Sequence, residues 1–286
     1  MAQYPERAGQ PAPPSLVARR AEVDAFVEPP SLVGLASEHV DLGGIATLAF
    51  HPPEPKATVM YLHGGGYRLS SPERYARFAA DLAGQTDCRV VVPRYRLAPE
   101  HPFPAGLNDA LAAYAALTKT DSIIIAGDSA GGGLACSLTL ALADSSDTCP
   151  AGLILISPWV DLRVQADSYD NRKTRDRVFS KQSALEAASL YLQGHSSYDP
   201  LVSPLLGNLA QFPPVLLFAG SEEVLLDDSI RLAKRLEAVS AEVDFRLVEG
   251  MQHVWPMLEP NLPQSLEAVD AMARFVSRIV SREARR

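Results

Sequence analysis

Short apolar, β-branched runs alternate with longer amphipathic stretches from about residue 38 to the end of the chain. The runs predict strands at 44–50, 57–62, 89–93, 122–126, 153–157, 215–219 and 243–248. From 89–93 onward the runs are nearly continuously apolar or lie between amphipathic stretches, as in a sheet covered on both faces. The amphipathic stretches predict helices at 73–85, 105–118, 130–143, 227–239 and 264–282. This order predicts an α/β fold with right-handed crossovers and a mostly parallel central sheet flanked by helices.

The last predicted helix carries an apolar stripe at spacings of three and four residues, which is typical of a face packed on the core. Its members are Leu266, Val269, Met272, Phe275, Val276, Ile279 and Val280.

Two segments break the alternation of strands and helices. Residues 1–14 read as a loose, proline-rich tail, and residues 15–28 as a helix stopped by Pro29-Pro30. Residues 160–205 contain no convincing strand; they are charged at 167–177, helical at 180–192 and turn-rich at 194–204. An insertion of this length between two strands is usually functional, and it would emerge at the edge where open α/β sheets bind ligands.

Composition narrows the class of protein. The 286 residues are 47% apolar and 21% charged, which suits one large globular domain. The net charge of −8 disfavours nucleic-acid binding. No run approaches the roughly 20 apolar residues of a membrane helix, so we expect no stable membrane insertion. The start lacks the pattern of a signal peptide. Cys88, Cys136 and Cys149 show no disulfide or zinc spacing and predict reduced thiols in the cytoplasm.

A nucleophilic serine is predicted where strand 122–126 runs into Gly127-Asp128-Ser129-Ala130-Gly131 and a helix follows. This G-x-S-x-G pattern stands in the strand–turn–helix context that its mechanism requires. The sharp turn projects the Ser129 hydroxyl above the sheet, and the flanking glycines let strand and helix backbones pass closely.

An oxyanion hole is predicted at His63-Gly64-Gly65-Gly66-Tyr67, which follows strand 57–62. Consecutive glycines can present backbone N–H groups to the negative charge that develops in acyl transfer. We expect Gly65, Gly66 and Ala130 to be the donors. A phosphate loop is disfavoured because no GK[ST] or GxGxxG pattern is present. His63 is expected to be structural, holding the loop in shape.

The base should follow the nucleophile and the acid in the chain, and His195 and His253 are the histidines after Ser129. His253 is preferred because it follows the last strand, whereas His195 lies in the insertion. The acid should lie in the loop after strand 215–219, within 220–228. Asp227 and Asp228 suit the start of a helix, which leaves Glu222 and Glu223.

Together these segments resemble the hormone-sensitive-lipase-like esterases, also called bacterial lipolytic family IV. The matching motifs are HGGGY (63–67), YRLAPEHPFPAGLNDA (95–110), GDSAGG (127–132), LLDDS (225–229) and the His253 loop. The resemblance implies an α/β-hydrolase fold with Ser129 as nucleophile and His253 as base. The family usually has aspartate as the acid in a D-x-L-x-D motif. Alignment on Leu225 and Asp227 places Glu223 there, with Glu222 and Asp227 as alternatives.

The resemblance also implies a cap built from residues 1–35 and 160–205 over a catalytic core of 36–159 and 206–286. We expect Tyr67 and Asp128 to contact the substrate and Asp109 to be structural. The resemblance implies neither a cofactor nor a metal. Because relatives are often dimers, a homodimer is an open alternative for this chain.

The implied activity is hydrolysis of short- to medium-chain acyl esters through an acyl-enzyme. An amide or carbamate hydrolase would use the same triad. A ligand-binding relative such as the gibberellin receptor has lost the histidine, which this chain retains. A metallohydrolase is disfavoured because the sequence has no HExxH motif or carboxylate–histidine cluster.

Overall fold

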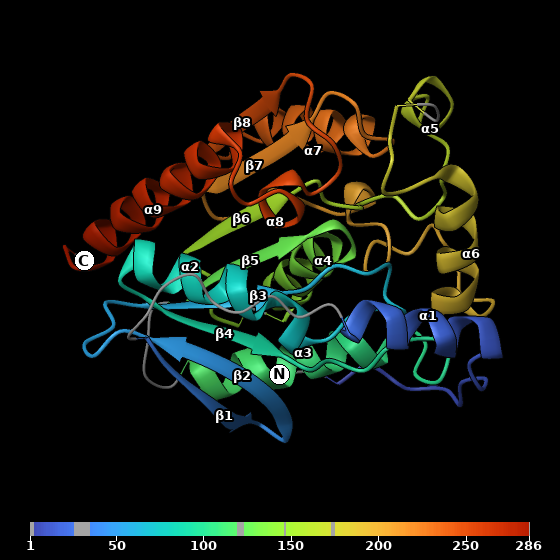
Figure 1. Ribbon diagram of the computed structural model, residues 1–286, viewed down its shortest axis with the longest axis horizontal. Helices are drawn as coiled ribbons and strands as arrows, with labels where there is room; N and C mark the ends of the chain where they lie inside the picture. The colour runs from blue at the N-terminus through green and yellow to red at the C-terminus, as the bar shows by residue number, and fades with distance from the viewer. Residues whose placement is uncertain (1–2, 26–34, 119–122, 146, 173–174, 286) are drawn as a thin grey trace.

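A single mixed sheet organises the chain (Figure 1). The computed structural model describes residues 3–25, 35–118, 123–145, 147–172 and 175–285. Its strand order is β1-β2-β4-β3-β5-β6-β7-β8, with β1 and β2 antiparallel and every pairing from β4 to β8 parallel. The strands are β1 (Ala36–Leu42), β2 (Ile45–His51), β3 (Thr58–Leu62), β4 (Arg89–Pro93), β5 (Ile123–Asp128), β6 (Gly152–Ile156), β7 (Val215–Gly220) and β8 (Val243–Val248).

Helices cover both faces of the sheet and create two apolar layers. α2 (Ala76–Thr86), preceded by the 3₁₀ turn η1 (Pro72–Tyr75), packs with α9 (Pro263–Glu283) on one face. α3 (Ala105–Leu117), α4 (Ser129–Asp144) and α7 (Leu226–Ala238) cover the other. Alternate residues of a central strand face opposite layers, so β3 sends Tyr61 to the first and Met60 to the second. Burial on both faces explains why these strands read as continuous apolar runs.

The predicted α/β class and the mostly parallel sheet are confirmed. Each predicted strand is found within one or two residues of its expected bounds; residue 122 lies outside the described residues. β1 was missed because its sequence ASEHVDL is polar and mostly exposed at the edge of the sheet. The helix predicted over 15–28 is α1 (Pro14–Ala25), and residues 26–28 lie outside the described part.

The stripe predicted on the last helix is only partly a core face. Met272, Phe275, Val276 and Ile279 are buried against the sheet. Leu266 is 60% exposed, so its assignment to the core was wrong. It lies in the first turn of α9, beyond the residues that the sheet covers.

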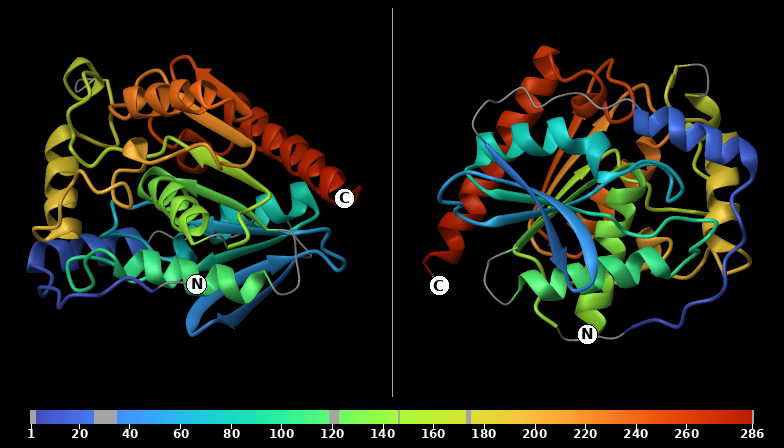
Figure 2. Two further views of the ribbon diagram at one scale, coloured as in Figure 1. Left: turned by 180° about the vertical axis from the view of Figure 1, so that it is seen from behind. Right: turned by 60° about the horizontal axis from the view of Figure 1, so that its bottom comes forward.

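Two segments far apart in the sequence meet at one end of the molecule. The insertion forms α5 (Ser168–Asn171), α6 (Lys181–Leu192) and the 3₁₀ turn η2 (Pro204–Leu206), and α6 lies beside α1 (Figures 1 and 2). The guanidinium of Arg7 donates to the carbonyl of Leu192 at 3.1 Å. Arg20 of α1 donates to the carbonyl of Arg68 at 2.8 Å, which ties α1 to the glycine loop after β3.

Candidate active site

Ser129 lies at the turn between β5 and α4 in a left-handed backbone conformation, with φ of 51°. Non-glycine residues seldom adopt this conformation, and it is found chiefly where surrounding structure enforces it. The backbone around this turn is closely packed, because a side chain on Gly131 would overlap the carbonyl oxygen of Leu62. The carbonyl of Ser129 also accepts a hydrogen bond from the Trp159 N–H at 2.8 Å.

The predicted base and acid converge on this serine. His253, from the loop after β8, places Nε2 at 3.0 Å from the Ser129 Oγ. Its Nδ1 lies 2.8 Å from Oε2 of Glu223, which follows β7. The other oxygen of Glu223, Oε1, accepts from the Gly220 N–H at 3.1 Å. All three side chains are buried, so little water competes for these contacts.

Two opposed effects act on the pKa of His253. Burial of the imidazole lowers it, because desolvation disfavours the charged form. The hydrogen bond and negative charge of Glu223 raise it, with smaller contributions from Asp176 and Asp128. The carboxylates prevail, and the pKa of His253 lies above its ordinary value of 6.5.

The other candidates for the acid are engaged elsewhere. Glu222 pairs with Arg175 at 3.4 Å. Asp227 accepts from the Ser168 N–H at 2.8 Å. Asp228 is fully buried and accepts from the N–H groups of Val160 and Asp161 at 3.0 and 3.1 Å. Both aspartates do lie in the first turn of α7, as predicted, and they also hold the start of the insertion against it.

His195 and Asp109 also form pairs of their own. His195 Nε2 lies 2.7 Å from Asp199 in the same turn-rich segment. Asp109 accepts hydrogen bonds from the N–H and guanidinium of Arg96 at 2.7 to 3.0 Å. Neither residue lines the cavity that holds Ser129.

The glycine loop presents free N–H groups beside Ser129. Gly65 and Gly66 have φ of 114° and 62°, conformations that favour glycine. Among the hydrogen bonds between described residues, neither N–H has a protein acceptor. The Gly64 N–H, by contrast, contacts Tyr75 Oη and Asp128 Oδ1, both at 2.9 Å. Ala130 lies in the first turn of α4, where backbone N–H groups lack partners within the helix.

His63 is buried behind this loop. Its Nδ1 lies 2.8 Å from the Gly64 carbonyl, and its ring stacks on Tyr95 at 4.4 Å between centroids. Desolvation lowers the pKa of His63 to about 4, so the ring is neutral at physiological pH. These contacts agree with the expectation that His63 shapes the loop.

The two residues predicted to contact the substrate make contacts within the protein. Tyr67 is buried in the core, with its ring stacked on Tyr191 at 4.0 Å, and it does not line the cavity at Ser129. Asp128 does line that cavity, but its carboxylate accepts from Tyr61 at 2.9 Å, from Tyr75 at 3.0 Å and from the Gly64 N–H. Asp128 therefore anchors the glycine loop. Burial raises its pKa to about 6, although the three donors act to lower it.

A cavity of about 330 Å³ opens over Ser129 and His253. Both parts of the predicted cap line it, with Arg19 and Val23 from α1 and with Val178 and Phe179 from the insertion. The Phe179 ring stacks on the imidazole of His253 at 5.7 Å between centroids. The chemistry at Ser129 thus faces a partly enclosed space with apolar walls.

Several residues that support this site carry no signal in the sequence. Tyr61 and Tyr75 lie in a buried strand and a short turn, where an aromatic residue reads simply as core. Phe179 lies in an irregular segment, and only the fold brings it over His253. Partners that are distant in the sequence cannot be recognised without the topology.

The described part of the chain contains no cluster of three or more histidine, cysteine or acidic side chains suited to a metal ion. None of its helices is both long and apolar enough to cross a bilayer. Its three cysteines are unpaired, with Cys88 and Cys136 buried.

Comparison with known proteins defines the class. A sequence model of the α/β hydrolase fold family matches residues 59–257. An acetyl-hydrolase from Streptomyces hygroscopicus is 37% identical over 223 residues, covering 77% of this chain and 75% of that protein. An esterase from Acinetobacter venetianus is 34% identical over 257 residues, covering 88% and 82%. The chain therefore belongs to the α/β hydrolase fold family.

Solved structures narrow the class further. An esterase from the bacterial hormone-sensitive lipase family superposes with a TM-score of 0.89 at 32% identity, covering 95% of this chain and 93% of that one. A hormone-sensitive lipase from a metagenome library gives 0.90 at 35%, covering 96% and 94%. Within its fold family the chain is a carboxylesterase of the hormone-sensitive-lipase-like group.

Proposed function

We propose that Ser129, His253 and Glu223 form a catalytic triad that hydrolyses short- to medium-chain acyl esters through an acyl-enzyme. The observation that carries the proposal is the continuous chain of contacts from Ser129 Oγ through the imidazole to Glu223, which faces the 330 Å³ cavity. The predicted small-molecule ester substrate suits a space of this size.

In the first half-reaction His253 Nε2 takes the proton of Ser129 as Oγ attacks the ester carbonyl carbon. Glu223 holds the Nδ1–H and stabilises the imidazolium without taking its proton. The N–H groups of Gly65, Gly66 and Ala130 stabilise the negative oxygen, and loss of one such donor typically costs about 10²–10³ in rate. His253 then protonates the leaving alkoxide as the carbon–oxygen bond breaks.

In the second half-reaction water gives a proton to His253 and attacks the acyl carbon. The same N–H groups stabilise the second tetrahedral intermediate. Collapse of that intermediate releases the carboxylic acid and returns the proton to Ser129 Oγ. Phe179 stacks on His253 and shields the imidazole from bulk water, which strengthens its contact with Glu223.

We further propose that residues 1–35 and 160–205 act as a cap over a core of 36–159 and 206–286. Support comes from α1 and the insertion, which both line the cavity. The unpaired cysteines favour the cytoplasm as the location of the protein. A homodimer stays a prediction.

Replacement of Ser129 by alanine tests this function. Turnover of p-nitrophenyl butyrate should fall by about 10⁶, because the serine and histidine act as a unit. Ser137→Ala is a matched control, since Ser137 is buried in the same helix and donates only to the Gly133 carbonyl. Normal turnover by Ser129→Ala, with an unchanged circular dichroism spectrum, would overturn the proposal.

A further inference from the structure

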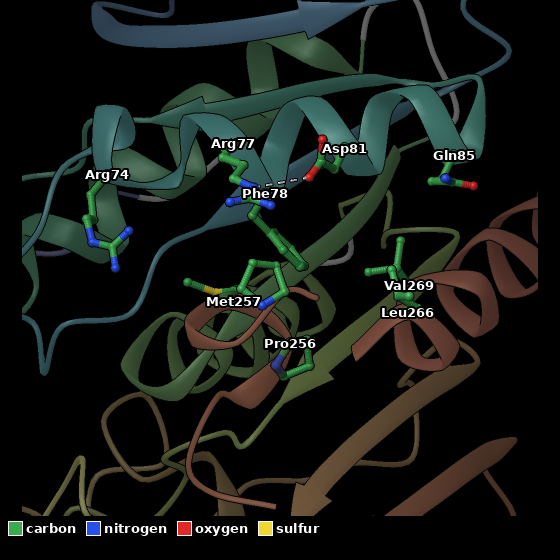
Figure 3. Close-up of a pocket in the computed structure, with 10 residues that line it drawn as sticks. Arg74, Arg77, Phe78, Asp81, Gln85, Pro256, Met257, Leu266 and Val269 are labelled. Carbon is green, nitrogen blue, oxygen red and sulfur yellow. Dashed lines mark ion pairs between the residues drawn. The ribbon is translucent and has the colours of Figure 1, made fainter. Parts of the chain in front are cut away.

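A second cavity of about 130 Å³ lies beside the active-site cavity, between α2, α9 and the short helix α8 (Trp255–Leu258). Phe78 points into it from α2, Pro256 and Met257 from α8, and Leu266 and Val269 from α9 (Figure 3). These side chains give the cavity an apolar interior.

The charged side chains that line the second cavity, Arg74, Arg77 and Asp81, come from η1 and α2. Arg77 and Asp81 form an ion pair at 3.8 Å on α2 (Figure 3). Arg77 also donates to Asn261 at 3.2 Å. Because Arg77 and Asp81 have partners within the protein and the remaining lining is largely apolar, the second cavity suits an apolar chain better than an ion.

Arg74 and Met257 line both the second cavity and the active-site cavity, and so lie between the two. Of these two side chains, Met257 is the apolar one. Its Sδ lies 3.2 Å from Tyr61 Oη, and the same hydroxyl contacts Asp128, the residue before Ser129. Methionine is unbranched and flexible, and it can change rotamer without backbone movement. A ligand could therefore displace the side chain and join the two spaces.

Leu266 lies on the opposite wall and is 60% exposed, although it belongs to the apolar stripe of α9. A single exposed leucine needs no explanation. Here the leucine faces the apolar cavity that Phe78 and Met257 line, so a chain in that cavity would cover it.

We propose that the second cavity holds the far end of an unbranched apolar chain of the substrate, and that Met257 and Leu266 determine which chain lengths are accepted. This inference rests on the proposed function of Ser129. The chain belongs either to the acyl or to the alkoxy part of the ester, and the two arms of the experiment distinguish them. Each methylene buried there should raise kcat/KM about fourfold.

The experiment compares long and short chains in the same enzyme preparation. One arm measures kcat/KM for p-nitrophenyl decanoate relative to butyrate, and the other for decyl acetate relative to butyl acetate. Leu266→Trp should fill the second cavity and lower the long-to-short ratio about fifteenfold, the value of two buried methylenes at about fourfold each. Met257→Ala should raise the ratio by a similar factor, and Met257→Leu should restore it.

Glu267→Trp is the matched control, because Glu267 is exposed on the next position of α9 and does not line the second cavity. A fall in the decanoate arm assigns the second cavity to acyl chains, and a fall in the decyl acetate arm assigns it to alkoxy chains. The proposal is overturned if Leu266→Trp matches Glu267→Trp within about twofold in both arms. These ratios come from active enzymes, so they are independent of the Ser129→Ala result.

Discussion

The Glu223→Gln substitution replaces one carboxylate oxygen of the proposed triad by an amide NH₂. Glu223 Oε1 accepts from the Gly220 N–H, and a glutamine would keep that bond with its own oxygen. Its amide NH₂ would then face His253 Nδ1 and donate to it. The imidazole proton would move to Nε2, which faces Ser129 Oγ at 3.0 Å and could no longer accept the serine proton.

The expected decrease in kcat follows from this reversed tautomer of His253. An equivalent exchange of carboxylate for amide in a serine-hydrolase triad lowers kcat by about 10⁴, or about 5 kcal/mol of barrier. The assay is the hydrolysis of p-nitrophenyl butyrate at saturating substrate. Glu222→Gln is the control, because Glu222 pairs with Arg175 and does not touch His253.

The pH profile of the same variant gives a second readout. His253 must be neutral to accept the proton, so wild-type kcat/KM should fall as pH drops through a midpoint above 6.5. Without the charge of Glu223, burial is opposed only by the smaller contributions of Asp176 and Asp128, and the midpoint should move to lower pH. The His253–Glu223 pair stabilises the folded state fully at pH values below the ordinary pKa of histidine. This stabilisation is lost as the pH rises through the raised pKa of His253.

The assignment of Glu223 is refuted if Glu223→Gln keeps turnover within about tenfold of wild type while Asp227→Asn loses it. An acid limb that stays in place in Glu223→Gln would separately refute the electrostatic part of the argument.

Two further substitutions test the supports of the site. Asp128→Asn should lower kcat for p-nitrophenyl butyrate about 10²-fold with little change in KM, because a displaced glycine loop misplaces the oxyanion donors; an unchanged kcat would contradict the anchoring role of Asp128. Glu186→Ala should lower the free energy of unfolding in urea by about 1–3 kcal/mol, because it leaves the buried guanidinium of Arg68 with Ser183 alone. Removal of the exposed Arg274–Asp270 pair should change the free energy of unfolding by less than about 0.5 kcal/mol. An equally small change in Glu186→Ala would show that the contact between Glu186 and Arg68 does not stabilise the fold.

The order of strands and helices could be predicted because a sheet buried on both faces requires continuous apolar runs. The polar edge strand β1 carries no such run, and its pairing with β2 depends on backbone hydrogen bonds that leave no sequence signal. The contact between Ser129 and His253 could be predicted because the order of elements confines each residue to one turn. Glu223 needed the family alignment, since only the coordinates distinguish its buried contact from the exposed pair of Glu222.

Neither Tyr67 nor Asp128 is freely available to contact a substrate: Tyr67 lies outside the cavity at Ser129, and the carboxylate of Asp128, which does line that cavity, is hydrogen-bonded within the protein. Both lie next to residues of the proposed site in the sequence, and adjacency in the sequence does not show where a side chain points. Tyr67 points into the core beneath the cap, and Asp128 points at the tyrosines that hold the glycine loop.

Covalent labelling tests the role of Ser129 most directly. An activated organophosphonate should form one adduct per chain, and mass spectrometry should locate it on the peptide that contains Ser129. Labelling should be lost in Ser129→Ala and slowed by several orders of magnitude in His253→Ala, in parallel with the loss of esterase activity. An adduct on a different serine, or full hydrolysis of p-nitrophenyl butyrate by a protein that the reagent never modifies, would contradict the assignment of Ser129 as the nucleophile.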